Sequence, residues 1–136
     1  LAPAIRGVTL VQLLANRGGI SGETAPPDKT LLDVHRLPGD AAEQRRAYVR
    51  QVLQRPLVAA PGSRYIYSNA GYVVAAHMGE RAARLPYEEL LRRRILQPLG
   101  MHSAGYGPMG RPGSPDQPRQ HQIRGTRLEP VQPTSL

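Results

Sequence analysis

The chain has 136 residues and a formal net charge of +8, and hydrophobic residues make up 40% of it. This length allows one small domain, whose core must be built from aliphatic residues and tyrosine without a disulfide, because Cys, Phe and Trp are absent. The charge does not indicate a nucleic-acid-binding protein, since it comes from scattered arginines and one lysine, Lys29, with no interleaved aromatic residues on which bases could stack.

Two helices are predicted in the first half of the chain. Thr9 is a suitable N-cap for a short helix whose leucines share one face, and Gly18-Gly19 forms the turn that ends it. Residues 21–38, which contain several prolines, are predicted to be loop with one helical turn at most. Asp40, followed by a glutamate three residues later, indicates a capping box and a helix over about residues 41–54.

Two more helices are predicted after a turn at Pro61-Gly62 and a short extended run. Residues 69–84 carry small and apolar side chains on nearly every side, which predicts a central helix that is buried almost all round. Pro86 takes the first position of the last helix, which ends near Pro98. Two oppositely charged pairs are expected to stabilise that helix, Glu88 with Arg92 and Glu89 with Arg93.

The character of the chain changes near residue 105. Residues 105–136 contain six Pro and five Gly and show no apolar periodicity, so this part is predicted to be a loop segment. Residues 1–104 are predicted to form the helical region of the same domain. The fold class expected for the chain by itself is therefore mostly α.

No serine nucleophile motif is present. A Ser-x-x-Lys pair needs a lysine, and the residue three positions before Lys29 is Pro26. There is no Gly-x-Ser-x-Gly elbow, and the stretch Lys29-Thr30-Leu31 lacks the glycine of a Lys-Thr-Gly strand. The chain by itself therefore offers no covalent catalytic route of these kinds.

A metal site or other cofactor is not expected either. None of the four histidines has a second histidine four residues away, and no cysteine assists them. The stretch His77-Met78-Gly79 matches a His-x-Gly pattern, but it falls in the middle of a predicted helix, where it cannot form a strand edge. We interpret that match as chance. The four histidines are His35, His77, His102 and His121.

The chemistry-bearing stretch that remains is Pro61-Gly62-Ser63-Arg64-Tyr65-Ile66-Tyr67-Ser68-Asn69-Ala70-Gly71-Tyr72. It resembles the Tyr-x-Asn region of class C β-lactamases, D-alanyl-D-alanine carboxypeptidases and related esterases. Three further stretches agree with that family in order and spacing, so that the resemblance covers about residues 7–107. These are Gly7 to Leu14 with Gly18-Gly19-Ile20, where Asn16 takes the place of a usual His; Pro86 to Leu91; and Ile95 to Met101, which ends in Pro-Leu-Gly-Met.

The resemblance implies two catalytic residues. Tyr67 would transfer protons, and a phenol needs neighbouring cations to do so near neutral pH. Asn69 would donate a hydrogen bond to the carbonyl of the bound amide or ester, while Ser68 is not expected to be a nucleophile. Read from the residues alone, Tyr67 is a packing loop tyrosine and Asn69 an ordinary helix N-cap.

The resemblance further implies that this chain is the central helical part of an α/β serine hydrolase, which acts on β-lactam, D-alanyl peptide or short ester bonds through an acyl-enzyme. By itself the chain is expected to be inactive, because it lacks the nucleophile, and to self-associate through the apolar face that a sheet would cover. A non-catalytic binding module, with a basic surface for an acidic partner, is the alternative.

Localisation follows only from the habit of the family, which is periplasmic or extracellular with cytoplasmic exceptions. No apolar run approaches the length of about 20 residues that a membrane-spanning helix requires. The expected partner is a small-molecule or peptide substrate, bound by the longer parent protein.

Overall fold

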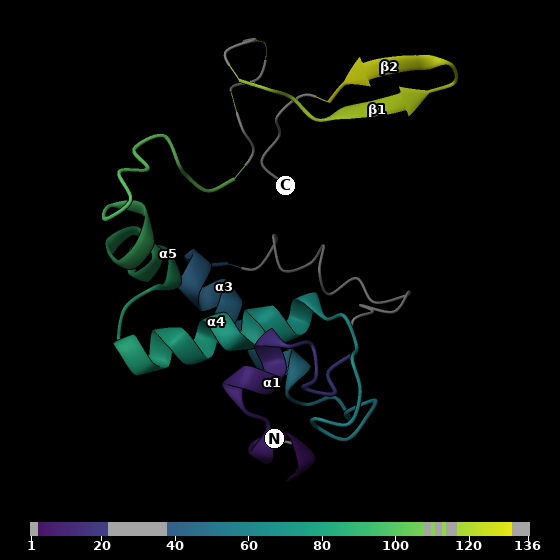
Figure 1. The fold of residues 1–136 in the computed structure, drawn as a ribbon, viewed down its shortest axis with the longest axis vertical. Coiled ribbons are helices and arrows are strands. Elements are labelled where there is room, and N and C mark those ends of the chain that lie inside the picture. Colours follow the sequence, from purple (N-terminus) through teal and green to yellow (C-terminus); the bar gives the residue numbers. More distant parts are fainter. Residues whose placement is uncertain (1–2, 22–37, 108–109, 111–112, 114–116, 132–136) are drawn as a thin grey trace. The chain divides into compact units, whose positions relative to one another are not determined.

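The computed structural model describes residues 3–21, 38–107, 110, 113 and 117–131. They fall into two compact units, Leu1–Leu99 and Gly100–Leu136. The first unit holds all of the described helices, and the second holds the described pair of strands (Figure 1). In chain order the elements are η1 (Pro3–Gly7), α1 (Leu10–Leu14), α3 (Ala41–Val52), α4 (Asn69–Ala83), α5 (Tyr87–Leu91), η2 (Arg92–Leu96), β1 (His121–Arg124) and β2 (Arg127–Pro130).

Helices α1 and α3 begin at capping boxes. The Thr9 hydroxyl accepts a hydrogen bond from the backbone N–H of Gln12, whose side chain accepts one from the backbone N–H of Thr9. Asp40 and Glu43 make the same reciprocal pair at the start of α3. Each box satisfies two N–H groups that the first helical turn leaves without partners. The helix predicted over residues 41–54 is confirmed and ends at Val52.

Helix α4 is the element on which α1, α3 and α5 pack. The prediction of burial on nearly every side is wrong, because its buried residues form one stripe while Tyr72 and Met78 are 44% and 38% exposed. The three neighbouring helices cover only part of its circumference, and small residues permit close approach without requiring it on every side. The buried residues of α4 are Ala70, Gly71, Val74 and Ala75.

One hydrophobic core lies between α4 and its neighbours. Leu13 of α1 is its most enclosed large side chain, with 2% of its surface exposed. The core is small and aliphatic, apart from Tyr48 of α3, as a chain without Phe or Trp requires. Its buried members are Ile5, Leu13, Ile20, Tyr48, Val49, Val52, Ala70, Val74 and Ala75.

The last helical stretch differs from the prediction. Pro86 is the N-cap of α5 and not its first helical residue, and the chain continues beyond Leu91 as the π-helical segment η2. Of the two predicted ion pairs, the one between Glu89 and Arg93 is confirmed. Glu88 accepts a hydrogen bond from Arg45 of α3, because α3 and α5 both pack on α4 and this brings the guanidinium within reach.

The second unit corrects the prediction that the C-terminal segment is all loop. Strands β1 and β2 pair antiparallel, with Ile123 opposite Leu128. They are joined by a two-residue turn whose first residue, Gly125, has a φ of 60°, which glycine adopts without steric cost. The strands escape detection because they are four residues long and nearly all exposed, so no face carries an apolar alternation.

In the described part of the chain, no helix has the length and hydrophobicity needed to cross a membrane. Lys29 and His35 lie outside the described residues.

Candidate active site

Tyr67 and Asn69 lie together where the chain enters α4. The run from Tyr65 to Ser68 is extended and has no regular secondary structure, and Asn69 is the first residue of the helix. The Tyr67 hydroxyl donates a hydrogen bond of 3.0 Å to Oδ1 of Asn69. Tyr67 is 60% exposed, so its hydroxyl is accessible to a bound molecule.

Asn16, just after α1, holds this extended run in place. Its backbone oxygen accepts a hydrogen bond of 2.7 Å from Ile66, and its side-chain oxygen accepts one of 3.0 Å from the backbone N–H of Ser68. The two bonds flank Tyr67 on both sides. Asn16 is buried and has a φ of 55°, a left-handed conformation that asparagine tolerates better than most residues.

Two further backbone hydrogen bonds continue the contact between these segments. Val58 donates to the carbonyl of Gly19 at 2.9 Å, and Gly62 donates to that of Arg17 at 2.8 Å. Gly19 has a φ of 72°, and a Cβ there would collide with the carbonyl oxygen of Ala59. The glycine is therefore required for residues 16–19 to lie against the loop before Tyr67.

Ser68 is the N-cap of α4, which corrects the assignment of that role to Asn69. Its Oγ accepts a hydrogen bond of 2.9 Å from the backbone N–H of Gly71 and donates one of 3.0 Å to the carbonyl of Ser21. Ser68 is 3% exposed, and its hydroxyl proton is directed at a carbonyl and not at a base. Because Ser68 takes the cap, the side chain of Asn69 is free to meet Tyr67.

The Tyr67 hydroxyl lacks a cationic neighbour in the described residues, where Asn69 is its hydrogen-bond partner. In this contact the phenol is the hydrogen-bond donor and the amide oxygen is the acceptor. The described residues provide an exposed tyrosine and asparagine that are joined by a hydrogen bond. Activation of the phenol needs a positive charge from elsewhere.

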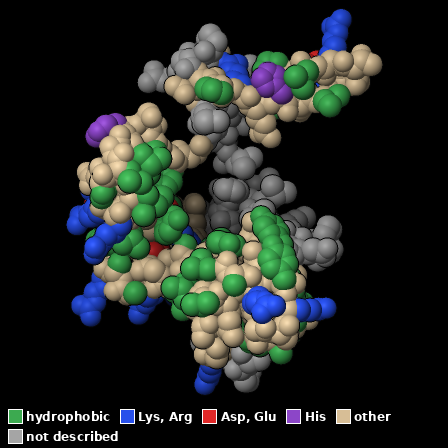
Figure 2. Space-filling view, viewed as in Figure 1, with side chains coloured by type: hydrophobic (Ala, Val, Ile, Leu, Met, Phe, Trp, Pro, Cys, Tyr) green, Lys and Arg blue, Asp and Glu red, His purple; other side chains and the backbone are tan. Residues whose placement is uncertain are grey.

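Helix α1 of the same unit carries exposed apolar side chains. Leu10, Val11 and Leu14 of α1 are each more than 40% exposed, and the Tyr72 hydroxyl donates a 2.9 Å hydrogen bond to the carbonyl of Leu14. Figure 2 shows hydrophobic side chains reaching the surface of this unit.

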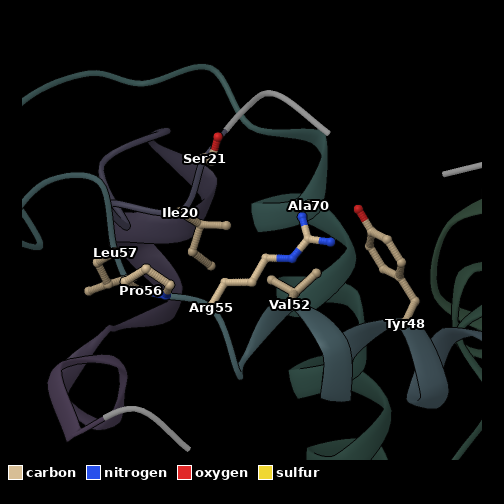
Figure 3. A pocket seen from close by; sticks show the side chains of 8 residues that line it. All are labelled: Ile20, Ser21, Tyr48, Val52, Arg55, Pro56, Leu57 and Ala70. Carbon is tan, nitrogen blue, oxygen red and sulfur yellow. The ribbon is translucent and has the colours of Figure 1, made fainter. Parts of the chain in front are cut away.

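A small cavity lies elsewhere in this unit, between the end of α3 and the start of α4. Its volume is about 20 Å³, which is room for one water molecule. Figure 3 shows the side chain of Arg55 extending through the group of residues that line it, between Ile20 and Tyr48. Neither Tyr67 nor Asn69 is among the described residues that line this cavity.

No cluster of three potential metal ligands occurs in the part of the chain that the structure describes. His77 lies within α4, as the sequence predicts, and its Nδ1 is 3.1 Å from Oε2 of Glu80. His77 is therefore part of a polar network with Glu80 on α4.

Comparison with known proteins identifies relatives over nearly the whole chain. A model of the Beta-lactamase family matches residues 1–134. The D-alanyl-D-alanine-carboxypeptidase/endopeptidase AmpH of Escherichia coli strain K12 is 35% identical over 92 residues, which are 68% of this chain and 22% of that protein.

Two solved structures have a similar fold. The octameric penicillin-binding protein homologue from Pyrococcus abyssi superposes with a TM-score of 0.62 and 26% identity, over 95% of this chain and 30% of that one. A D-stereospecific amidohydrolase from a Streptomyces species gives a TM-score of 0.65 with 23% identity, over 93% of this chain and 38% of that one. The chain therefore spans well under half the length of each of these proteins.

Proposed function

We propose that this chain, which belongs to the beta-lactamase family, contributes Tyr67 and Asn69 to the active site of a serine hydrolase. The reaction class is hydrolysis of a β-lactam, a D-alanyl peptide or a short ester through an acyl-enzyme. The observation that carries the proposal is the 3.0 Å hydrogen bond between Tyr67 and Asn69, on an exposed surface, in a run anchored on both sides by Asn16.

The two side chains have different roles in this proposal. Tyr67 moves the proton between the attacking hydroxyl and the leaving group, which requires the phenol to be made more acidic by nearby cations. Asn69 uses its amide to hold the substrate carbonyl and the activating cation in position. In the present arrangement Oδ1 of Asn69 accepts from Tyr67, so its amide N–H groups are directed elsewhere and can donate to a substrate.

The proposal includes inactivity of this chain by itself. The sequence contains no Ser-x-x-Lys pair, and the described residues place no cation at the Tyr67 hydroxyl. Loss of the nucleophile removes the covalent route, so the 136 residues alone are expected not to form an acyl-enzyme. A labelled penicillin and a p-nitrophenyl ester, each incubated with this chain, should give no covalent adduct.

The decisive experiment uses a longer polypeptide of the same protein that contains a Ser-x-x-Lys segment. Tyr67→Phe in that polypeptide should lower kcat about 10²–10⁴-fold, as expected for loss of a proton-transfer group, with little change in KM. Tyr65→Phe is the matched control, because Tyr65 is also an exposed tyrosine of the same run. Equal activity of the two variants would contradict the role of Tyr67.

Two further properties belong to the same proposal. Self-association is expected from the exposed apolar side chains of α1, and the relative from Pyrococcus abyssi is octameric by its description. Sedimentation of the chain as a single monomeric species at micromolar concentration would contradict this expectation. A periplasmic or extracellular location is proposed from family habit, and fractionation of cells that express the gene would test it.

A further inference from the structure

A hollow of about 420 Å³ lies on the first unit, away from Tyr67 and Asn69. It is bordered by α3, by the last turns of α4 and by the residues that lead to α5. Tyr67 precedes α4, whereas the hollow begins eight residues into that helix and extends past its end. Because an α-helix rises about 1.5 Å per residue, the first half of α4 separates the two places. The described lining residues are Ala42, Arg46, His77, Glu80, Arg81, Arg84, Leu85 and Pro86.

Glu80 is the one carboxylate among the described lining residues, and its oxygens already have partners. Its Oε1 accepts hydrogen bonds from Arg45 and, at 3.0 Å, from the backbone N–H of Tyr87. Its Oε2 lies 3.1 Å from Nδ1 of His77. Both oxygens of Glu80 are therefore occupied, and little negative charge remains to balance the arginines that share the hollow.

Three arginine side chains of the lining have no counter-charge among the described residues. Arg46, Arg81 and Arg84 are exposed, and none of their side chains makes an ion pair or hydrogen bond in the described structure. They approach the hollow from two helices, Arg46 from α3 and the other two from the end of α4. Arg84 is the C-cap of α4 in a left-handed conformation, with φ 55° and ψ 35°.

The helix dipole explains only part of this arrangement. Cations near the C-terminus of a helix are favoured, which accounts for Arg81 and Arg84. Arg46 lies in the interior of α3, where the dipole has no such preference, yet it lines the same hollow. Like charges that line one hollow repel each other, and an anion bound between them would offset that repulsion.

We propose that this hollow binds the phosphate group of a soluble phosphorylated small molecule. Guanidinium groups donate paired hydrogen bonds whose spacing matches phosphate oxygens, and several of them can surround one dianion. The volume of about 420 Å³ falls within the range of small-molecule sites, which is about 300–1,000 Å³. His77 adds a ring nitrogen to the same lining.

Calorimetric titration of the chain with inorganic phosphate and with pyrophosphate tests the proposal. The double variant Arg81→Gln/Arg84→Asn removes two of the charges, and asparagine tolerates the left-handed backbone at position 84. Loss of two charge-assisted hydrogen bonds should weaken binding about tenfold or more. The control Arg6→Gln/Arg94→Gln removes the same net charge from exposed arginines outside the hollow and should bind as the unmodified chain does.

A second measurement locates the ligand. In the NMR spectrum, phosphate should shift the ring signals of His77, which lines the hollow, and leave those of His102 and His121 in place. Equal weakening in the two double variants, or no shift at His77, would overturn the proposal. Binding to phosphoinositide vesicles without binding to either soluble phosphate would also overturn it, because the source would then be a lipid headgroup.

Discussion

The side-chain oxygen of Asn16 accepts a 3.0 Å hydrogen bond from the backbone N–H of Ser68, which lies 52 residues later in the chain. This bond connects the end of α1 to the residue that caps α4. Because Tyr67 precedes Ser68, the orientation of the proposed catalytic tyrosine depends on a buried asparagine. The same asparagine adopts a left-handed backbone conformation, so both its conformation and its side chain contribute to holding the run before α4 in place.

Replacement of Asn16 should separate these two contributions. Asn16→Ala leaves the buried N–H of Ser68 unpaired and puts alanine, which tolerates a left-handed conformation less well than asparagine, at this position, and we expect a loss of about 3 kcal/mol in the free energy of unfolding. Asn16→Gly removes the hydrogen bond but relieves the backbone, so its loss should be about 1 kcal/mol smaller. Urea denaturation measures both, and identical losses would mean that the left-handed conformation costs nothing.

The cap of α4 provides a second test. Ser68→Ala removes the acceptor for the backbone N–H of Gly71 and the donor to the Ser21 carbonyl, which should cost about 1–2 kcal/mol of unfolding free energy. Ser63→Ala is the control, because Ser63 is exposed and its Oγ donates only to the carbonyl of Ala60. A thermal melt should show a clear drop for position 68 alone. Similar melts for both variants would argue against Ser68 as the N-cap.

Arg45 links three helices and should be more sensitive than its neighbour. It donates to Glu80 of α4 and Glu88 of α5, and its guanidinium lies 5.4 Å from the centre of the Tyr87 ring. Arg45→Met leaves the largely buried Glu80 without its main counter-charge, which should cost about 3 kcal/mol.

The neighbouring substitution Arg46→Met is the control for that experiment. Arg46 is exposed and has no ion pair in the described structure, so this variant should stay within about 0.5 kcal/mol of the unmodified chain. Chemical denaturation of the two variants side by side gives the comparison. If Arg46→Met lowered the free energy of unfolding as much as Arg45→Met does, the loss of positive charge would explain both effects. The contact with Glu80 would then not be needed.

Glu89 is expected to titrate in an unusually acidic range. Hydrogen bonds from Arg92 and then Arg93 lower the pKa of its carboxyl group from 4.5 to about 2. Because the folded pKa lies below the unfolded one, the stabilisation is complete above about pH 4.5 and is lost as the pH falls towards 2. Arg92→Gln should raise the pKa of Glu89, as followed by NMR, whereas Arg94→Gln should leave it in place. A midpoint for Glu89 near 4.5 in the unmodified chain would contradict the contact.

Local signals in the sequence predicted the helices well. The capping box predicted at Asp40 depends on residues three positions apart, so it can be recognised without knowledge of the fold. Thr9 was predicted as an N-cap, and the structure adds the reciprocal contact with Gln12. Tyr67 and Asn69 are also close in the sequence, two positions apart. They became candidates because residues 61–72 resemble the Tyr-x-Asn region of the family. Strands β1 and β2 were missed because a short, exposed hairpin carries no apolar alternation.

What the sequence by itself determined was therefore local: where helices begin, which residues form the tyrosine–asparagine motif, and that no Ser-x-x-Lys pair is present. The tertiary structure alone decided that Asn16 holds Ser68, that Arg45 holds Glu80, and that Arg46 shares a hollow with Arg81 and Arg84. These partners are tens of residues apart and follow no period. They meet only because burial of the small core brings α1 and α3 against α4, and that packing depends on the whole chain at once.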